Sequence, residues 1–280
     1  MTKSAELSVP ALMRKYGLSA RKSLGQNFLL DEAALEKVVA AAEIPAQATV
    51  LEIGPGLGSL TRHLARAADR VVAVELDQNL IPALQEVLSA EKNVTILHGD
   101  ILEQNIPALV SDPGYLVVAN IPYYITSAVI RHLLEAPVRP SRLVLTMQKE
   151  VADRICAKPG DLSLLALSVQ VYGEPRPVAR IPAGAFYPPP NVDSMVLRVD
   201  LYPEPRIPND QLNDFFRLAK MGFAQKRKTL RNTLSAGLHW APEKAAQMLA
   251  AAEIDPMRRA ETLSLAEWAR LVCVYRETAK

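Results

Sequence analysis

Short runs of β-branched residues alternate with amphipathic stretches between Thr49 and Leu145, and this alternation constrains the fold more than any other feature of the chain. Strand-like runs lie at 50–53, 71–74, 94–97, 115–119 and 143–146, with helical patterns at 57–67 and from about Asp77 onward. Strands that alternate with helices over short connections are typical of a mostly parallel sheet with helices on both faces. The chain is therefore predicted to contain a doubly wound α/β sheet.

The second half of the chain predicts a different organisation. Strands are expected at 167–172 and 192–201, as an antiparallel addition to the sheet edge, with the proline-rich segment 175–190 as a constrained surface loop. Pro203, Pro205 and Pro208 then interrupt the chain, and helical patterns follow at 209–222, 226–236, 242–252 and 264–276. We expect an α/β domain with an N-terminal extension over 1–202 and a small helical domain over 203–280.

Charge is distributed unevenly along the 280 residues, although the formal net charge is only +2. Residues 1–26 and 203–280 each carry +4, so the middle of the chain carries −6. Basic ends favour contact with a polyanion, while the acidic centre would carry the chemistry. The alternative is that the charges merely segregate on solvated faces.

The sequence also argues against membrane, secreted and metal-binding proteins. The longest apolar runs are well short of the roughly 18 to 20 residues that span a bilayer, and the N-terminus has no apolar signal segment, so neither a membrane helix nor secretion is expected. Cys156 and Cys273 form no metal or redox spacing, which suits a reducing cytoplasm, and the four histidines are scattered. We expect no metal.

A glycine-rich turn follows the first predicted strand, with Gly54, Gly56 and Gly58 at every second position. Glycines at such a turn let the backbone approach a ligand, and the helix that follows supplies free N–H groups. A dinucleotide-binding turn would have its third glycine one position later, where this chain has Ser59. The pattern favours a nucleoside ligand without a pyrophosphate over a dinucleotide, and a turn without any ligand is the alternative.

Two acidic residues end the next two strands. Glu75 is placed to accept hydrogen bonds from both hydroxyls of a ribose, and Asp100 to accept one from the exocyclic amine of an adenine. Either acid alone could instead cap a helix. Together with the glycine turn, their positions at strand ends predict a nucleoside site at the carboxyl edge of the sheet.

The fourth strand ends in Asn120, Ile121, Pro122 and Tyr123, which resembles the Asn/Asp-Pro-Pro-Tyr motif of methyltransferases that modify amino groups of nucleobases. Such an amine is a poor nucleophile because its lone pair is delocalised into the ring. The Asn120 side-chain oxygen and the Ile121 carbonyl can accept its two N–H bonds, and Tyr123 can stack on an extruded base. A proline turn with a buried tyrosine is the alternative.

Beyond these motifs, the chain resembles the ribosomal RNA adenine dimethyltransferase family from Lys22 to about Leu271, and most closely its small-subunit branch. The resemblance also includes five segments outside the motifs above, at 25–29, 148–152, 186–194, 226–232 and 254–261. It implies a Rossmann-like class I methyltransferase sheet with a small helical C-terminal domain, and S-adenosylmethionine as the methyl donor. It implies that Phe186 faces Tyr123 across the target base, the alternative being that Phe186 anchors the proline-rich loop in the core. The residues that would contact the donor are Asn27, Leu29, Gly54, Gly56, Glu75, Asp100 and Asn120.

The expected activity is N6-dimethylation of two adjacent adenosines near the 3′ end of small-subunit ribosomal RNA, by a cytoplasmic monomer. Lys226, Arg227, Lys228 and Arg231 are expected to contact the RNA, the alternative being a solvated face or intramolecular pairing. Alternatives for the whole chain are a large-subunit adenine methyltransferase that confers antibiotic resistance and an assembly factor that acts mainly by binding RNA. The chain departs from the small-subunit pattern at Tyr124 and in a shorter loop after Gly160.

Overall fold

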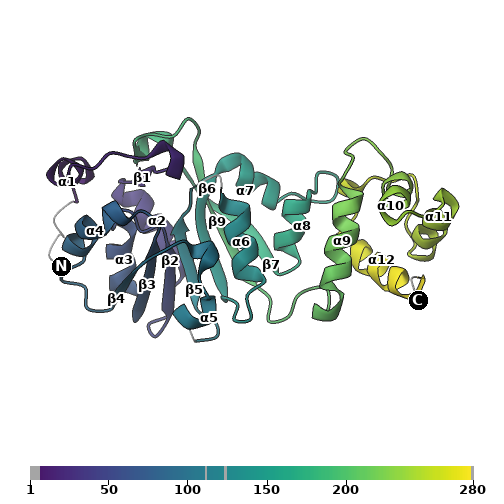
Figure 1. The fold of residues 1–280 in the computed structure, drawn as a ribbon, viewed down its shortest axis with the longest axis horizontal. Helices are drawn as coiled ribbons and strands as arrows, with labels where there is room; N and C mark the ends of the chain where they lie inside the picture. The colour runs from purple at the N-terminus through teal and green to yellow at the C-terminus, as the bar shows by residue number, and fades with distance from the viewer. Residues whose placement is uncertain (1–6, 111, 123–124, 279–280) are drawn as a thin grey trace. The chain divides into compact units, whose positions relative to one another are not determined.

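The computed structural model describes residues 7–278 except 111, 123 and 124 (Figure 1). Its contacts divide the chain into two compact units. The first consists of Met1–Ala152 and Arg176–Leu201, and the second of Asp153–Pro175 and Tyr202–Lys280. The sequence predicted a single division after residue 202. The structure differs in segment 153–175, which belongs to the unit that contains the C-terminal helices.

The first unit is built on a seven-stranded sheet. Its strands, in spatial order, are β4 (Val94–His98), β3 (Arg70–Glu75), β2 (Thr49–Ile53), β5 (Leu116–Asn120), β6 (Arg142–Gln148), β9 (Ser194–Leu201) and β7 (Gly173–Ile181). β4, β3, β2, β5 and β6 are parallel to one another, and β9 pairs with β6 in the antiparallel sense. All five strands expected between residues 50 and 146 are confirmed.

The strand order fixes where a ligand can bind. The chain moves outward from β2 through β3 to β4 and then returns to β5 on the other side of β2. The order therefore reverses between β2 and β5, and the crevice at such a switch point is the usual ligand site of an open α/β sheet. Every residue of β2 is buried, as a central strand requires.

Helices cover the sheet and complete the core of this unit. Leu35 and Val38 of α2 and Leu60 and Leu64 of α3 pack with Val50 of β2 in one apolar cluster. The helices of this unit are α1 (Val9–Tyr16), α2 (Glu32–Ala42), α3 (Ser59–Ala67), α4 (Ile81–Val87), α5 (Ile106–Leu109) and α6 (Thr126–Leu134). α7 (Lys149–Ile155) crosses from the first unit into the second.

A two-stranded ribbon lies beside the main sheet. It consists of β1 (Phe28–Leu29) and β8 (Phe186–Tyr187), which pair antiparallel although they are far apart in the sequence (Figure 1). This ribbon joins the N-terminal segment to the segment that leads into β9.

The structure corrects two expectations about the sheet edge: segment 167–172 is not a strand, and the first part of the proline-rich segment 175–190 is not a loop. Residues 167–172, expected as a strand, belong mostly to helix α8 (Leu164–Gln170). Ser163 is the N-cap of this helix, because its hydroxyl accepts a hydrogen bond from the Ala166 N–H at 3.1 Å. The strand is instead β7, which contains Pro175 and Pro177. An edge strand tolerates proline because its outward N–H groups need no partner.

The second unit is helical. Besides α8 it contains α9 (Leu212–Gly222), α10 (Leu230–Leu238), α11 (Pro242–Ala251) and α12 (Leu265–Thr278), which confirms the four helices expected after residue 208. Phe215 and Trp268 are fully buried at its centre with ring centroids 6.4 Å apart. A Cβ at Gly222 would lie 2.8 Å from the Trp268 ring, so α9 and α12 can pack this closely only with glycine there.

No helix among the described residues is long and apolar enough to cross a membrane. In the same residues, no group of three or more His, Cys, Asp or Glu side chains is arranged to hold a metal ion.

Candidate active site

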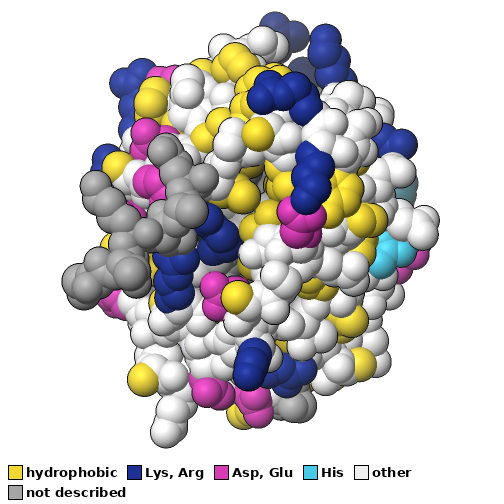
Figure 2. Space-filling model, turned by 90° about the vertical axis from the view of Figure 1, so that its left-hand side faces the viewer, with side chains coloured by type: hydrophobic (Ala, Val, Ile, Leu, Met, Phe, Trp, Pro, Cys, Tyr) yellow, Lys and Arg dark blue, Asp and Glu magenta, His cyan; other side chains and the backbone are white. Residues whose placement is uncertain are grey.

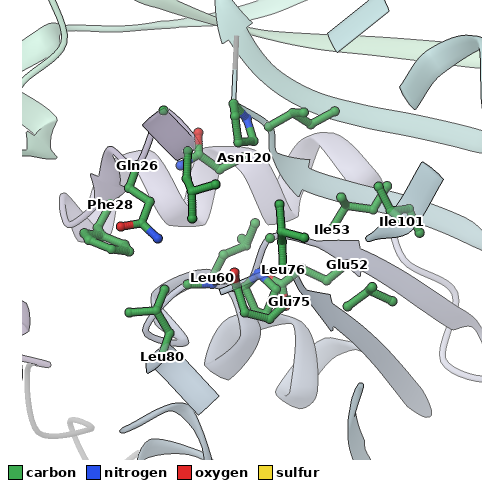
Figure 3. A pocket seen from close by; sticks show the side chains of 18 of the residues that line it. Gln26, Phe28, Glu52, Ile53, Leu60, Glu75, Leu76, Leu80, Ile101 and Asn120 are labelled. Carbon is green, nitrogen blue, oxygen red and sulfur yellow. Dashed lines mark hydrogen bonds between the residues drawn. The ribbon is translucent and has the colours of Figure 1, made fainter. Parts of the chain in front are cut away.

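A pocket lies at the carboxyl ends of β2, β3 and β5, where the strand order reverses (Figure 3). Its walls come from the glycine-rich turn, the ends of β3 and β5, the start of the segment after β4, and residues 24–29. The pocket brings together these predicted site residues: Asn27, Leu29, Gly54, Gly56, Glu75, Asp100, Asn120, Ile121 and Pro122. Tyr123 and Tyr124 lie outside the described residues.

The glycine-rich turn has the backbone conformation that the sequence analysis required. Gly54, Gly56 and Gly58 have φ values of 68°, 60° and 84°, in the left-handed region that favours glycine. At Gly56 space is restricted as well, because a Cβ there would lie 2.9 Å from the ring of Phe28. The turn is thus held directly beneath the N-terminal segment.

Glu75 is anchored by two backbone N–H groups, one from the glycine-rich turn and one from the residue two positions after Glu75. Its Oε2 accepts a hydrogen bond from the Gly56 N–H at 2.9 Å, and its Oε1 accepts one from the Asp77 N–H at 2.8 Å. Burial raises the pKa of the Glu75 carboxyl, and the two backbone donors oppose that shift. Each oxygen retains a second lone pair, so the fixed carboxyl can still accept hydrogen bonds from a ligand.

Asp100 has a structural role as well as its place in the pocket. Its Oδ1 accepts a hydrogen bond from the Leu102 N–H at 2.9 Å and so caps a short 3₁₀ turn. The capping alternative considered for this residue is therefore present, and it orients the carboxyl group in the pocket wall.

Asn120, at the end of β5, is held by the N-terminal segment. Its Nδ2 donates to the backbone carbonyl of Asn27 at 3.0 Å. That bond uses the amide nitrogen and leaves the Oδ1 available as an acceptor. The next residue, Ile121, donates its N–H to the Thr146 carbonyl of β6 at 3.3 Å, which fixes the turn after the strand.

Two pocket residues lacked an assigned role in the sequence analysis. Glu52, in the middle of β2, is 1% exposed, and its Oε2 has no hydrogen-bond partner among the described residues. Burial raises its pKa to about 8. The signal in the sequence was a single acid inside a buried apolar strand.

Gln26 is the second such residue, and it joins the N-terminal segment to the sheet. Its Oε1 accepts a hydrogen bond from the Arg21 N–H, and its Nε2 donates to the buried Asp77, both at 2.8 Å. No sequence periodicity marks such a contact, because its two partners are 5 and 51 residues away.

Part of the basic N-terminal charge is used inside the molecule. Lys15 pairs with Glu86 at 2.6 Å, and Arg21 lies 3.4 Å from Asp77. On the face drawn in Figure 2, Lys and Arg side chains are scattered among apolar and neutral ones rather than gathered in one patch. Intramolecular pairing therefore accounts for part of the N-terminal charge.

The remaining predicted residues lie outside the pocket. Phe186 is 4% exposed and belongs to the core cluster that contains Leu29. Lys226, Arg227 and Lys228 are exposed in the turn before α10, and Arg231 is in its first helical turn. These four have no acidic partner among the described residues, and they belong to the second unit.

Comparison with known proteins matches nearly the whole chain to one protein family. The family model described as ribosomal RNA adenine dimethylase matches residues 17–276. A ribosomal RNA small subunit methyltransferase A of Dehalococcoides mccartyi (strain CBDB1) is 47% identical over 94% of this chain and 91% of the relative. One of Geobacillus thermodenitrificans (strain NG80-2) is 44% identical over 93% and 92%.

Two solved structures resemble the fold over most of its length. A dimethyladenosine transferase from Plasmodium falciparum superimposes with a TM-score of 0.78 at 24% identity, over 90% of this chain and 98% of that one. The 23S rRNA methyltransferase ErmE superimposes with a TM-score of 0.70 at 27% identity, over 89% and 99%.

Proposed function

The chain belongs to the ribosomal RNA adenine dimethylase family, and on that premise we propose that it dimethylates N6 of two adjacent adenosines near the 3′ end of small-subunit ribosomal RNA. The methyl donor is S-adenosylmethionine, which when bound supplies an electrophilic methyl group on a sulfonium. The observation that supports this proposal best is the orientation of Asn120. Its amide nitrogen is occupied by Asn27, so its oxygen is left for the target amine.

The pocket residues suit this donor. Glu75 accepts hydrogen bonds from the ribose hydroxyls and Asp100 accepts one from the adenine amine, while Gly54 and Gly56 let the backbone come close to the ligand. Asn27 and Leu29 complete the wall on the side of the N-terminal segment. Glu52 also lines the pocket, and the positive charge of this donor would supply the partner that its buried Oε2 lacks among the described residues.

The target base enters beside Asn120. The Asn120 Oδ1 and the Ile121 carbonyl accept the two N–H bonds of the amine, which concentrates the lone pair on nitrogen. Pro122 restricts the turn that presents both acceptors. Tyr123 stacks on the extruded base, and the place of Phe186 opposite it stays a prediction.

Replacement of Asn120 tests the chemistry. Asn120→Ala is expected to lower the methyl-transfer rate by on the order of 10²-fold or more, because a preorganised acceptor is lost where charge develops. RNA affinity should change much less. A single-turnover assay at saturating RNA measures this, and a rate within a few-fold of wild type would remove Asn120 from the mechanism.

Small-subunit RNA is proposed as the substrate because relatives named for the small subunit are 47% identical, whereas ErmE, named for 23S rRNA, is 27% identical. Small and large subunits from cells that lack this protein provide the test. The enzyme should methylate only the small subunit, and mapping of methylated adenines in ribosomal RNA should show a loss in those cells. Methylation of the large subunit alone would move the chain to the resistance branch.

We propose that RNA is contacted by Lys226, Arg227, Lys228 and Arg231. These side chains have no acidic partner among the described residues, and the phosphates of the RNA would be their anionic partners. We place the enzyme in the cytoplasm, acting as a monomer. Cys156 and Cys273 are both free thiols, which suits a reducing compartment.

A further inference from the structure

The segment between β8 and β9 lies at the same edge of the sheet as Asn120. Ser194, the first residue of β9, pairs with Gln148, the last residue of β6. In the next strand, Asn120 pairs with Thr146 of β6. Residues just before Ser194 therefore lie at the carboxyl edge of the parallel strands, where the target base must enter.

In the β1–β8 ribbon, the two aromatic residues of β8, Phe186 and Tyr187, lie on opposite faces. Leu29 pairs with Phe186, and Phe28 pairs with Tyr187. Directly paired residues of antiparallel strands lie on the same face, and neighbours along a strand lie on opposite faces. Leu29 and Phe186 belong to the core, at 3% and 4% exposure. Tyr187 thus shares the face of Phe28, which packs in a second apolar cluster, and Phe28 and Leu29 both line the donor pocket.

Tyr187 is the open member of this face. Its exposure is 41%, against 8% for Phe28. Among the described residues its side chain has neither a hydrogen bond nor a ring contact. Its partner Phe28 directly follows Asn27, whose carbonyl holds the amide of Asn120. A large aromatic ring with no hydrogen bond or ring contact among the described residues is thus connected, through Phe28 and Asn27, to Asn120, the proposed acceptor for the target amine.

We propose that Tyr187 is a stacking platform for an unpaired base of the substrate RNA next to the target adenine. A nucleobase fits because every base has a π-face, and stacking on an exposed tyrosine needs no further polar partner. The inference rests on the proposed function for the identity of the substrate. It adds a contact that anchors the strand beside the extruded base, outside the donor pocket.

Kinetics with small-subunit particles from cells that lack this protein test the proposal. Tyr187→Ala should raise the KM for particles at least about fivefold, which corresponds to the ~1 kcal/mol lower end of base stacking on an aromatic side chain. Its kcat should stay within a few-fold of wild type, and its donor affinity by calorimetry should be unchanged. Tyr187→Phe keeps the ring and should behave as wild type.

Val178→Ala is the matched control, because Val178 is an equally exposed apolar residue at 45% on edge strand β7. A KM for Tyr187→Ala equal to that of wild type, or a rise shared by Tyr187→Phe or Val178→Ala, would overturn the proposal. If wild type itself failed to methylate the particles, the proposed function would fail. The contribution of Tyr187 would then be decided by filter binding to the same particles.

Discussion

Glu52 is the residue at which the fold departs furthest from ordinary core composition. A carboxyl group at 1% exposure in the central strand has lost its hydration, and its Oε2 gains no hydrogen bond from the described residues in return. An apolar residue at this position would stabilise the sheet more. The carboxyl is explained by its place in the pocket wall, where a bound cation would supply the missing partner.

This arrangement predicts a pH dependence for the protein without donor. Burial raises the pKa of Glu52 from 4.5 to about 8, so the folded state favours the protonated form. The contribution of this raised pKa to the free energy of unfolding is therefore fully present below about pH 4.5 and is lost as pH rises through about 8. From pH 5 to pH 8, the melting temperature of Glu52→Gln should rise steadily relative to that of wild type, because glutamine cannot ionise.

Donor binding should show the opposite trend. A cationic donor binds the ionised carboxyl better, so the affinity of wild type should rise as pH approaches 8, whereas that of Glu52→Gln should be lower and nearly flat. If the melting temperatures of wild type and Glu52→Gln instead changed in parallel from pH 5 to pH 8, Glu52 would be ionised in the pocket without donor.

At the residue scale, the sequence predicted what depends on local pattern. Glu75 and Asn120 end recognisable strands, the glycine turn and Asp100 follow closely after two others, and the structure brings all of them into one pocket. Gln26 could not be predicted in this way, because its contact with Asp77 depends on how the N-terminal segment folds back over the sheet.

At the scale of elements, residues 9–29, from α1 to β1, form a strap that is tied down at α1 and lines the donor pocket at 24–29. α1 is tied to α4 because Lys15 and Tyr16 both contact the carboxylate of Glu86, at 2.6 and 2.5 Å. Residues 24–29 then line the pocket, with Gln26 as the link to Asp77. Hydrogen bonding to Gln26 contributes to holding the pKa of Asp77 below its usual value, against the opposing effect of burial.

Loosening the strap should weaken donor binding. Gln26→Leu removes two hydrogen bonds, one of them to a carboxylate, and is expected to raise the donor dissociation constant roughly tenfold. Calorimetry measures the effect. Gln78→Leu, an exposed change one residue after Asp77, is the control. Equal affinities for the two variants would show that the strap does not contribute to the site.

Prediction of the elements was limited at the sheet edge. Segment 167–172 begins with alternating apolar and polar residues, which is typical of a strand, yet most of it is helical because the helix that begins after the Ser163 cap continues through it. Pro175 and Pro177 argued against a strand, yet an outer strand can accept them. The central strands were predictable because their β-branched runs are buried on both faces.

At the scale of the whole molecule, donor chemistry and the proposed RNA contact belong to different units. Replacing Lys226, Arg227 and Lys228 with Gln should lower RNA affinity and flatten its log–log salt dependence by roughly two units, at ~0.7 to 0.9 for each phosphate that is no longer neutralised. Filter binding across a salt series measures the slope. Donor affinity should not change, because these cations belong to the second unit and the donor pocket to the first.

Intramolecular pairing of the three cations would give the reverse result. The slope would stay unchanged, and the melting temperature would fall instead. Lys244→Gln is a suitable control, because Lys244 lies over the ring of Trp240 at 4.1 Å in the same unit, outside the cluster.

The chain passes between its two units three times, at residues 152, 175 and 201, and this has a consequence for synthesis on the ribosome. Segment 153–175 is made before β8 and β9, but the helices of its own unit are made last. Until then Tyr172 lacks Phe216, with which its ring stacks at 6.4 Å, and the N–H of Gly160 lacks the carbonyl of Glu261. The α/β sheet can therefore be completed while apolar side chains of segment 153–175 remain uncovered until the end of translation.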